Sequence, residues 1–281
     1  MLTECTCYDG DKQEFCMTWL QIIVLAIVQG LTEFLPISSS GHLILVPAFA
    51  GWTDQGLSFD VAVHFGSLGA VCVFFRNDIA GLFRGAGDVL AGRSETLQAR
   101  MAWCIGLGTI PAAIAGLLLA GWIAGNLRSP MIVVVTLAGY GVLMALADRF
   151  APRDRNISSI RIRDALIIGA AQSLSLVPGT SRSGITITAG RLLGFGRQDA
   201  ARFSFLLSTP VILLATMYQV VKLITGDLPV AWENLVIAAL VSGIVAYLSI
   251  DFFMRFVGAL GLLPFAMYRL LLAGVILYVL Y

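Results

Sequence analysis

Residues 29–42 read QGLTEFLPISSSGH and directly follow the apolar run WLQIIVLAIV of residues 19–28. This stretch places a glutamate, a histidine and three serines inside a segment that is otherwise suited to lipid. Pro36 and Gly41 interrupt a regular helix, and the serines between them are favoured at the start of a new one. The stretch therefore predicts two short helices that meet at a polar break.

The composition shows that most of the surface faces lipid. Of the 281 residues, 58% are hydrophobic and only 12% are charged, with a mean hydropathy of +0.87. A helix that spans a membrane needs about 20 mostly apolar residues. Such runs occupy residues 58–75, 101–124, 129–147, 203–222, 231–251 and 258–280. We therefore expect an all-α polytopic membrane protein with about six full transmembrane helices, and the net charge of +1 indicates no nucleic-acid partner.

The distribution of arginine predicts how the chain is oriented. Arginines concentrate in segments 76–100, 148–163 and 191–202. The positive-inside rule places these segments in the cytoplasm, and it places the acidic stretch 1–16 and the arginine-free segment 223–230 outside. Stretches 17–50 and 164–190 must then each enter and leave on one face. Both are predicted to be re-entrant helix-loop-helix hairpins, whose tips are candidate walls of a site.

The two hairpin tips resemble each other in sequence. A shift of 143 places QGLTEFLPISSSG (29–41) over QSLSLVPGTSRSG (172–184), with six matched positions. Three predicted spans separate the copies, so the copies have opposite orientations in the membrane. The sequence thus predicts an inverted-topology repeat, 17–147 and 148–281, after an N-terminal extension, 1–16. Chance similarity between turns rich in Ser, Gly and Pro is the alternative.

The first tip carries several groups that could perform chemistry. A carboxylate within an apolar run is a candidate functional group, because it is costly there unless it is paired or hydrated, and this points to Glu33. His42 is a candidate acid or base, or an interfacial side chain. Ser38 and Ser39 are candidate helix caps and candidate nucleophiles, and a helix N-terminus also suits a phosphate.

The second tip supplies a cation. Arg182 is the only charged residue between Asp164 and Arg191, and a guanidinium binds oxyanions through two parallel hydrogen bonds. A purely structural ion pair between Arg182 and Glu33 is the alternative. Nearby hydroxyl groups belong to Ser181, Ser183 and Thr186. Together the two tips predict a polar chamber suited to phosphoryl transfer.

At these residues the sequence resembles a known family. QGLTEFLPISSSGH is similar to the (Glu/Gln)-x-x-x-Glu motif with its trailing Pro-x-Ser-Ser-x-Gly-His, and PGTSRSGIT (178–186) is similar to the motif Pro-Gly-x-Ser-Arg-Ser-Gly-x-Thr. Both are motifs of the undecaprenyl-pyrophosphate phosphatases of the bacitracin-resistance type. The resemblance runs from about residue 17 to the C-terminus and includes FSFLLSTP (203–210) and LPFAMYR (263–269). Gln29 takes the less frequent option of the first motif.

The resemblance implies an integral membrane phosphatase. Members hydrolyse undecaprenyl (C55 isoprenoid) pyrophosphate to undecaprenyl phosphate and inorganic phosphate, assisted by Mg²⁺ or Ca²⁺. This recycles the lipid carrier for cell-wall synthesis and confers resistance to bacitracin. The implied location is the bacterial inner membrane, with the active site opening to the outer, periplasmic face.

The resemblance also implies roles for individual residues. Ser39 would attack the terminal phosphorus, His42 would manage the proton, and Arg182 would hold the charge of the transition state. Glu33 would orient the metal or His42, and a metal-binding role for Gln29 is doubtful. The implied pyrophosphate-binding residues are Gln29, Ser38, Ser181, Ser183 and Thr186. Whether Ser39 or His42 is the nucleophile stays open, because a serine needs an adjacent base whereas a neutral imidazole can attack unaided.

Other features leave alternatives open. The inverted repeat would equally suit a transporter that flips the polyprenyl phosphate. His64 is compatible with core packing, with the wall of a lipid-tail tunnel, or with chemistry. A homodimer is an open alternative. Cys72 and Cys104 are expected to pack as small apolar side chains, and the three cysteines in segment 1–16 would allow one disulfide.

Overall fold

The computed structural model describes residues 17–53, 55–93, 95–127, 129–225 and 232–280. Within these ranges the chain forms eleven α-helices and two short 3₁₀ turns, with no strand. The helices are α1 (Trp19–Thr32), α2 (Ser39–Ala50), α3 (Gly56–Phe74), α4 (Arg76–Leu90), α5 (Leu97–Asn126), α6 (Pro130–Phe150), α7 (Ile162–Ser173), α8 (Arg182–Leu192), α9 (Arg197–Ile224), α10 (Trp232–Leu260) and α11 (Leu263–Leu280). The all-α prediction is confirmed, and the predicted N-terminal extension with its three cysteines lies outside the described residues.

Five helices of the described ranges, rather than the six expected, are long and apolar enough to cross a membrane. They are α3, α5, α6, α9 and α10. The difference arises at the predicted span 258–280. Gly261 has a φ of 73°, which a side chain would disfavour, so α10 ends at Leu260 and the shorter helix α11 begins at Leu263.

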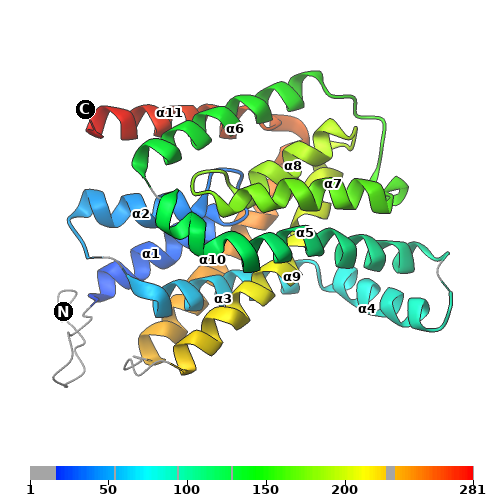
Figure 1. Ribbon diagram of the computed structural model, residues 1–281, viewed down its shortest axis with the longest axis horizontal. Coiled ribbons are helices and arrows are strands. Elements are labelled where there is room, and N and C mark those ends of the chain that lie inside the picture. Colours follow the sequence, from blue (N-terminus) through cyan, green and yellow to red (C-terminus); the bar gives the residue numbers. More distant parts are fainter. Residues whose placement is uncertain (1–16, 54, 94, 128, 226–231, 281) are drawn as a thin grey trace.

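Helix α4 was missed by sequence analysis, which treated 76–100 as a loop. Its mixture of polar and apolar residues does not resemble a membrane span. Helix α4 packs on α5 at Gly85, where an added Cβ would lie only 2.1 Å from the Gln98 carbonyl oxygen. An ion pair between Asp78 and Arg202 joins it to α9. The C-terminal end of α4 and the N-terminal end of α5 lie at the right-hand end of the molecule in Figure 1.

Local structure recurs at the same offset as the sequence. Helices α1 and α7 begin at Trp19 and Ile162, which are 143 residues apart, and α2 and α8 begin 143 residues apart as well. The residue before each second helix has a positive φ, 75° at Ser38 and 68° at Ser181. No other residue except glycine has a positive φ in the described chain. The two tips therefore share a backbone conformation as well as a sequence.

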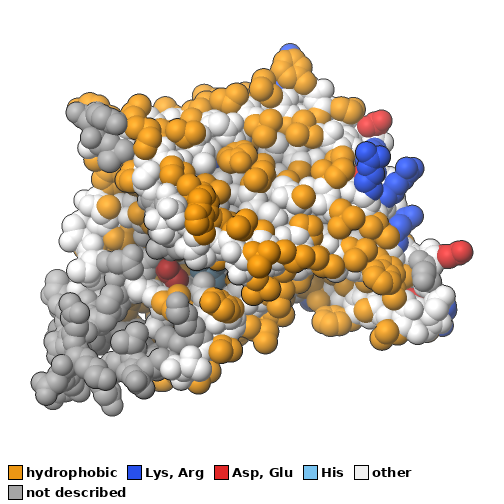
Figure 2. All heavy atoms as spheres, in the orientation of Figure 1, with side chains coloured by type: hydrophobic (Ala, Val, Ile, Leu, Met, Phe, Trp, Pro, Cys, Tyr) orange, Lys and Arg blue, Asp and Glu red, His pale blue; other side chains and the backbone are white. Residues whose placement is uncertain are grey.

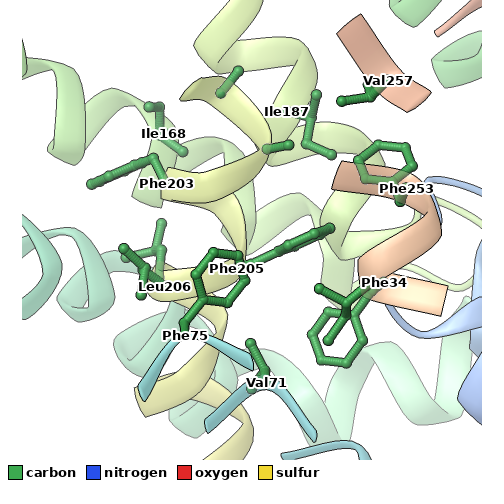
Figure 3. Packing of buried hydrophobic residues seen from close by; sticks show 14 of the residues in the cluster. Phe34, Val71, Phe75, Ile168, Ile187, Phe203, Phe205, Leu206, Phe253 and Val257 are labelled. Atoms are coloured by element: carbon green, nitrogen blue, oxygen red, sulfur yellow. The ribbon is translucent and has the colours of Figure 1, made fainter. Parts of the chain in front are cut away.

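A cluster of aromatic residues anchors the first tip. Phe34 is fully buried, and its ring meets Phe205 of α9 edge to face at a centroid distance of 5.3 Å. Phe75 and Phe253 also pack against Phe205 (Figure 3). Because Phe34 directly follows Glu33 in the chain, this core fixes the position of the carboxylate. Cys104 is buried and Cys72 is half-buried, as expected for packing residues.

Small residues bring α1, α3 and α10 close together. An added Cβ would lie 2.6 Å from the Ser242 carbonyl oxygen at Gly30 and 2.0 Å from the Ala239 carbonyl oxygen at Gly66. The hydroxyl groups of Ser67 and Ser242 lie 3.1 Å apart across the same contact. Small residues and hydroxyl groups of this kind are typical of helix packing within membranes. The packing leaves α1 with its C-terminal end, and hence Glu33, inside the bundle.

Candidate active site

The two hairpin tips meet at Glu33. The Glu33 carboxylate is buried, and its Oε1 accepts a hydrogen bond from Arg182 Nη2 at 2.9 Å. Its Oε2 accepts from Ser39 Oγ at 2.7 Å and from Gln29 Nε2 at 2.8 Å. One hydrogen-bonded cluster therefore joins four residues that the sequence singled out. They come from two segments about 150 positions apart.

Ser39 and Arg182 occupy equivalent positions in their hairpins and face each other across this carboxylate. Each is the first residue of the second helix of its hairpin, α2 or α8. In the second tip, Ser181 caps the helix by accepting from the Gly184 N–H at 3.2 Å. Glu33 ends α1, and its own N–H bonds to the Gln29 carbonyl. The site is thus built from one helix end and two helix starts, which direct free N–H groups toward any anion bound there.

Arg182 retains donors for a ligand. Its side chain is 13% exposed, and its guanidinium carbon lies 5.7 Å from the centre of the Phe34 ring. Among the described residues Glu33 is its only side-chain hydrogen-bond partner, through one of five N–H groups. The remaining N–H groups can bind a phosphate oxygen while the ion pair with Glu33 stays intact.

His42 has a different partner from the one the sequence suggested. The resemblance implied that His42 manages the proton when Ser39 attacks, but the Ser39 hydroxyl donates to Glu33. The Nδ1 atom of His42 lies 2.8 Å from the Ser38 carbonyl oxygen, and its Nε2 atom lies 2.6 Å from the hydroxyl oxygen of Tyr268. The two rings are nearly parallel, at an interplanar angle of 11°.

His64 joins the cluster from α3. Its Nε2 lies 3.7 Å from Glu33 Oε2, and 35% of its side chain is exposed, whereas Glu33 is 6% exposed. Its Nδ1 lies 2.7 Å from the Asp60 carbonyl oxygen. The sequence left its role open, and the structure places it on the accessible side of the carboxylate.

Sequence analysis missed two residues of α11. Tyr268 contacts His42, and Arg269, which is 1% exposed, donates to five backbone carbonyl groups. These carbonyls belong to Pro36 in the first tip, to two residues of the second tip and to two residues of α6. An arginine in an apolar helix is a signal for function or internal pairing, and this signal could have identified Arg269.

The predicted hydroxyl groups of both tips also serve the fold. Ser183 Oγ donates to the Leu35 carbonyl at 3.0 Å, and Thr186 Oγ1 lies 2.6 Å from the Ser204 hydroxyl. Ser181 caps α8, and Ser38 Oγ lies 3.4 Å from Ser40 Oγ. These contacts shape the tips. The binding of pyrophosphate by the same hydroxyl groups stays a prediction.

The donor set at Glu33 fits a hard divalent cation. No group of three or more His, Cys, Asp or Glu side chains lies together in the part of the chain that the structure describes. However, Gln29 Oε1 is buried and has no hydrogen-bond partner among the residues that the structure describes, although the nitrogen of the same amide donates to Glu33. Mg²⁺ binds through one or two protein oxygens together with water and substrate phosphates. Glu33 and Gln29 could supply those protein oxygens.

Comparisons with known proteins agree with these features. Residues 22–275 match the family described as bacitracin resistance protein BacA. The chain is 50% identical over 264 residues to undecaprenyl-diphosphatase 2 of Stutzerimonas stutzeri, covering 93% of this chain and 98% of that relative. It is also 50% identical over 265 residues to the undecaprenyl-diphosphatase of Hahella chejuensis, covering 94% of this chain and 99% of the relative. This chain therefore belongs to the bacitracin resistance protein BacA family of undecaprenyl-diphosphatases.

Proposed function

We propose that the cluster around Glu33 is the site at which this undecaprenyl-diphosphatase hydrolyses undecaprenyl pyrophosphate to undecaprenyl phosphate and inorganic phosphate. The observation that carries the proposal is the position of Glu33 between Ser39 and Arg182. A hydroxyl nucleophile, an acceptor for its proton and an oxyanion clamp lie within one hydrogen-bonded set. Phosphoryl transfer depends chiefly on this kind of positioning and charge stabilisation.

Ser39 is the nucleophile in this mechanism. Its Oγ bonds to the terminal phosphorus while its proton passes to Glu33 Oε2, the atom to which it already donates. The bond from phosphorus to the bridging oxygen breaks, and undecaprenyl phosphate leaves. The free N–H groups of Arg182 bind the oxygens on which charge develops. Direct attack by His42 is disfavoured because both of its ring nitrogens are already within hydrogen-bonding distance of other groups.

A bound Mg²⁺ or Ca²⁺ would neutralise charge on the pyrophosphate oxygens. Glu33 and Gln29 Oε1 would hold it, with the substrate completing its coordination. The amide of Gln29 meanwhile keeps the carboxylate oriented by donating to Oε2.

We propose that the two hairpins are re-entrant and belong to an inverted repeat of 17–147 and 148–281, with the site open to the outer face of the bacterial inner membrane. The shared offset of 143 between helix starts supports the repeat. Hairpin α1–α2 lies toward the left of Figure 1 and hairpin α7–α8 toward the right. Figure 2 shows that lysine and arginine side chains gather at the right-hand end. That end is then cytoplasmic, and the polyprenyl tail stays in the bilayer.

Phosphate release tests the proposed function. Purified protein in detergent should release inorganic phosphate from undecaprenyl pyrophosphate, and Ser39→Ala should abolish most of this activity. Ser158→Ala, at an exposed serine outside both hairpins, is the matched control. A flippase without hydrolase activity would instead move the lipid phosphate between leaflets of vesicles and release no phosphate. Wild-type turnover in the Ser39→Ala protein would refute the assignment of the nucleophile.

A further inference from the structure

The hydrogen bonds of His42 define which of its nitrogens carries the proton. A backbone carbonyl can only accept, so Nδ1 must be the N–H that donates to the Ser38 carbonyl oxygen at 2.8 Å. In the neutral ring, Nε2 is then an acceptor. The Tyr268 hydroxyl, 2.6 Å away, must be the donor to it. The lone pair of Nε2 is therefore directed at the phenol and not at open space.

The two residues differ in exposure. His42 is buried, with 9% of its surface exposed, whereas Tyr268 is 41% exposed. The phenolic oxygen keeps lone pairs that can accept a further hydrogen bond. A proton that reaches Nε2 from the site can thus pass through the Tyr268 hydroxyl.

The first chemical step does not need this pathway. The proton of Ser39 already has an acceptor in Glu33 Oε2, at 2.7 Å. Hydrolysis of the resulting phosphoserine does need another acceptor, because Glu33 then holds the serine proton and an attacking water must lose one of its own. Two histidines of the described site lie outside hydrogen-bonding distance of Glu33, His64 at 3.7 Å from Oε2 and His42 on α2, the helix that begins with Ser39. His64 faces the carboxylate that holds the serine proton in this step, so the acceptor we assign to the water is His42 together with Tyr268.

We propose that Tyr268 relays a proton from the attacking water to His42 in the second step of the reaction; this rests on the proposed function above. The water oxygen bonds to phosphorus, and the bond from phosphorus to Ser39 Oγ breaks. Ser39 Oγ takes the electron pair and recovers its proton from Glu33. The water proton passes to the Tyr268 oxygen while the phenolic proton passes to His42 Nε2, which later returns a proton to solvent by the reverse path.

The neighbouring residue holds Tyr268 in place. Arg269 donates to carbonyl groups of both tips, including the Thr180 carbonyl at 2.9 Å and the Gly179 carbonyl at 3.0 Å. Helix α11 is thus fastened to the loops that carry the site. This attachment keeps Tyr268 beside the tips, where its hydroxyl lies 2.6 Å from His42 Nε2.

Tyr268→Phe tests the relay because it removes the hydroxyl and retains the ring that stacks on His42. We expect kcat to fall at least tenfold with KM unchanged. Because the second step becomes limiting, acid-stable phosphoprotein should accumulate when turnover is quenched. Tyr278→Phe, the same substitution at an 86% exposed position of the same helix, should match the wild type.

A double-mutant cycle separates the relay from simple packing. In a His42→Ala background, Tyr268→Phe should cause no further loss, because the hydroxyl acts through Nε2. Equal losses in both backgrounds, wild-type kcat for Tyr268→Phe, or a fall in kcat without phosphoprotein would each overturn the proposal. Failure of the proposed function is seen separately, as absence of phosphate release from the wild type or full activity of Ser39→Ala.

Discussion

Replacing Arg182 by lysine tests whether the geometry of the guanidinium, beyond its charge, drives the reaction. Lysine keeps one positive charge on a flexible chain but concentrates its donors on one nitrogen. In the structure, Arg182 Nη2 donates to Glu33 Oε1 at 2.9 Å, and the other N–H groups remain for the phosphate. A lysine that keeps the contact with Glu33 cannot also present two parallel donors to an oxyanion.

The size of the effect follows from the hydrogen bonds to phosphate that lysine cannot form. Removing one hydrogen bond to a charged group costs about 1.5–3 kcal/mol. Loss of a single donor to the transition state in other enzymes costs roughly 10²–10³ in kcat. Each 1.36 kcal/mol corresponds to about a tenfold change in rate. We therefore expect Arg182→Lys to lower kcat by about 100-fold or more, while the protein stays folded because the charge opposite Glu33 is retained.

The assay is phosphate release from undecaprenyl pyrophosphate by purified protein, with thermal unfolding in detergent as a check on folding. Arg84→Lys on the exposed surface of α4 is the control and should behave as the wild type. If Arg182→Lys retained turnover within about threefold of the wild type, position 182 would supply only positive potential. The clamp in the proposed mechanism would then be incorrect.

Three further outcomes are expected. Gln29→Glu places a second carboxylate beside Glu33 in place of an amide donor. Half-maximal activation by Mg²⁺ should therefore occur at a concentration at least tenfold lower. An unchanged activation curve would contradict the proposed ligands. Arg269→Leu leaves five carbonyl groups without their donor. It should lower the free energy of unfolding by about 3 kcal/mol or more, measured as loss of thermal stability. An unchanged melting temperature would contradict this expectation. Single cysteines at Arg155 and Thr225 should be labelled from opposite sides of the membrane, and labelling from the same side would refute the inverted repeat.

Sequence reasoning recovered the features that depend on local composition. Helices follow from apolar runs, so four of the six predicted spans coincide closely with α3, α5, α6 and α9, and α10 extends beyond its predicted end. The polar tips were found because ionisable groups are rare and costly in lipid. The ion pair of Glu33 with Arg182 was considered only as the alternative to oxyanion binding by Arg182, and the structure contains this pair.

What the sequence by itself determined was thus that the chain lies in a membrane, the positions of most of its helices other than α4, and the identity of the charged groups at the two tips. Only the tertiary structure decided that Ser39 donates to Glu33, and that His42 meets Tyr268, a residue 226 positions away in the chain. It also decided that Gly261 shortens the last helix. The physical reason is that periodicity and composition report on neighbours within a few residues. The partner of a buried donor depends on how distant helices pack, and in this protein α11 brings that partner to the site.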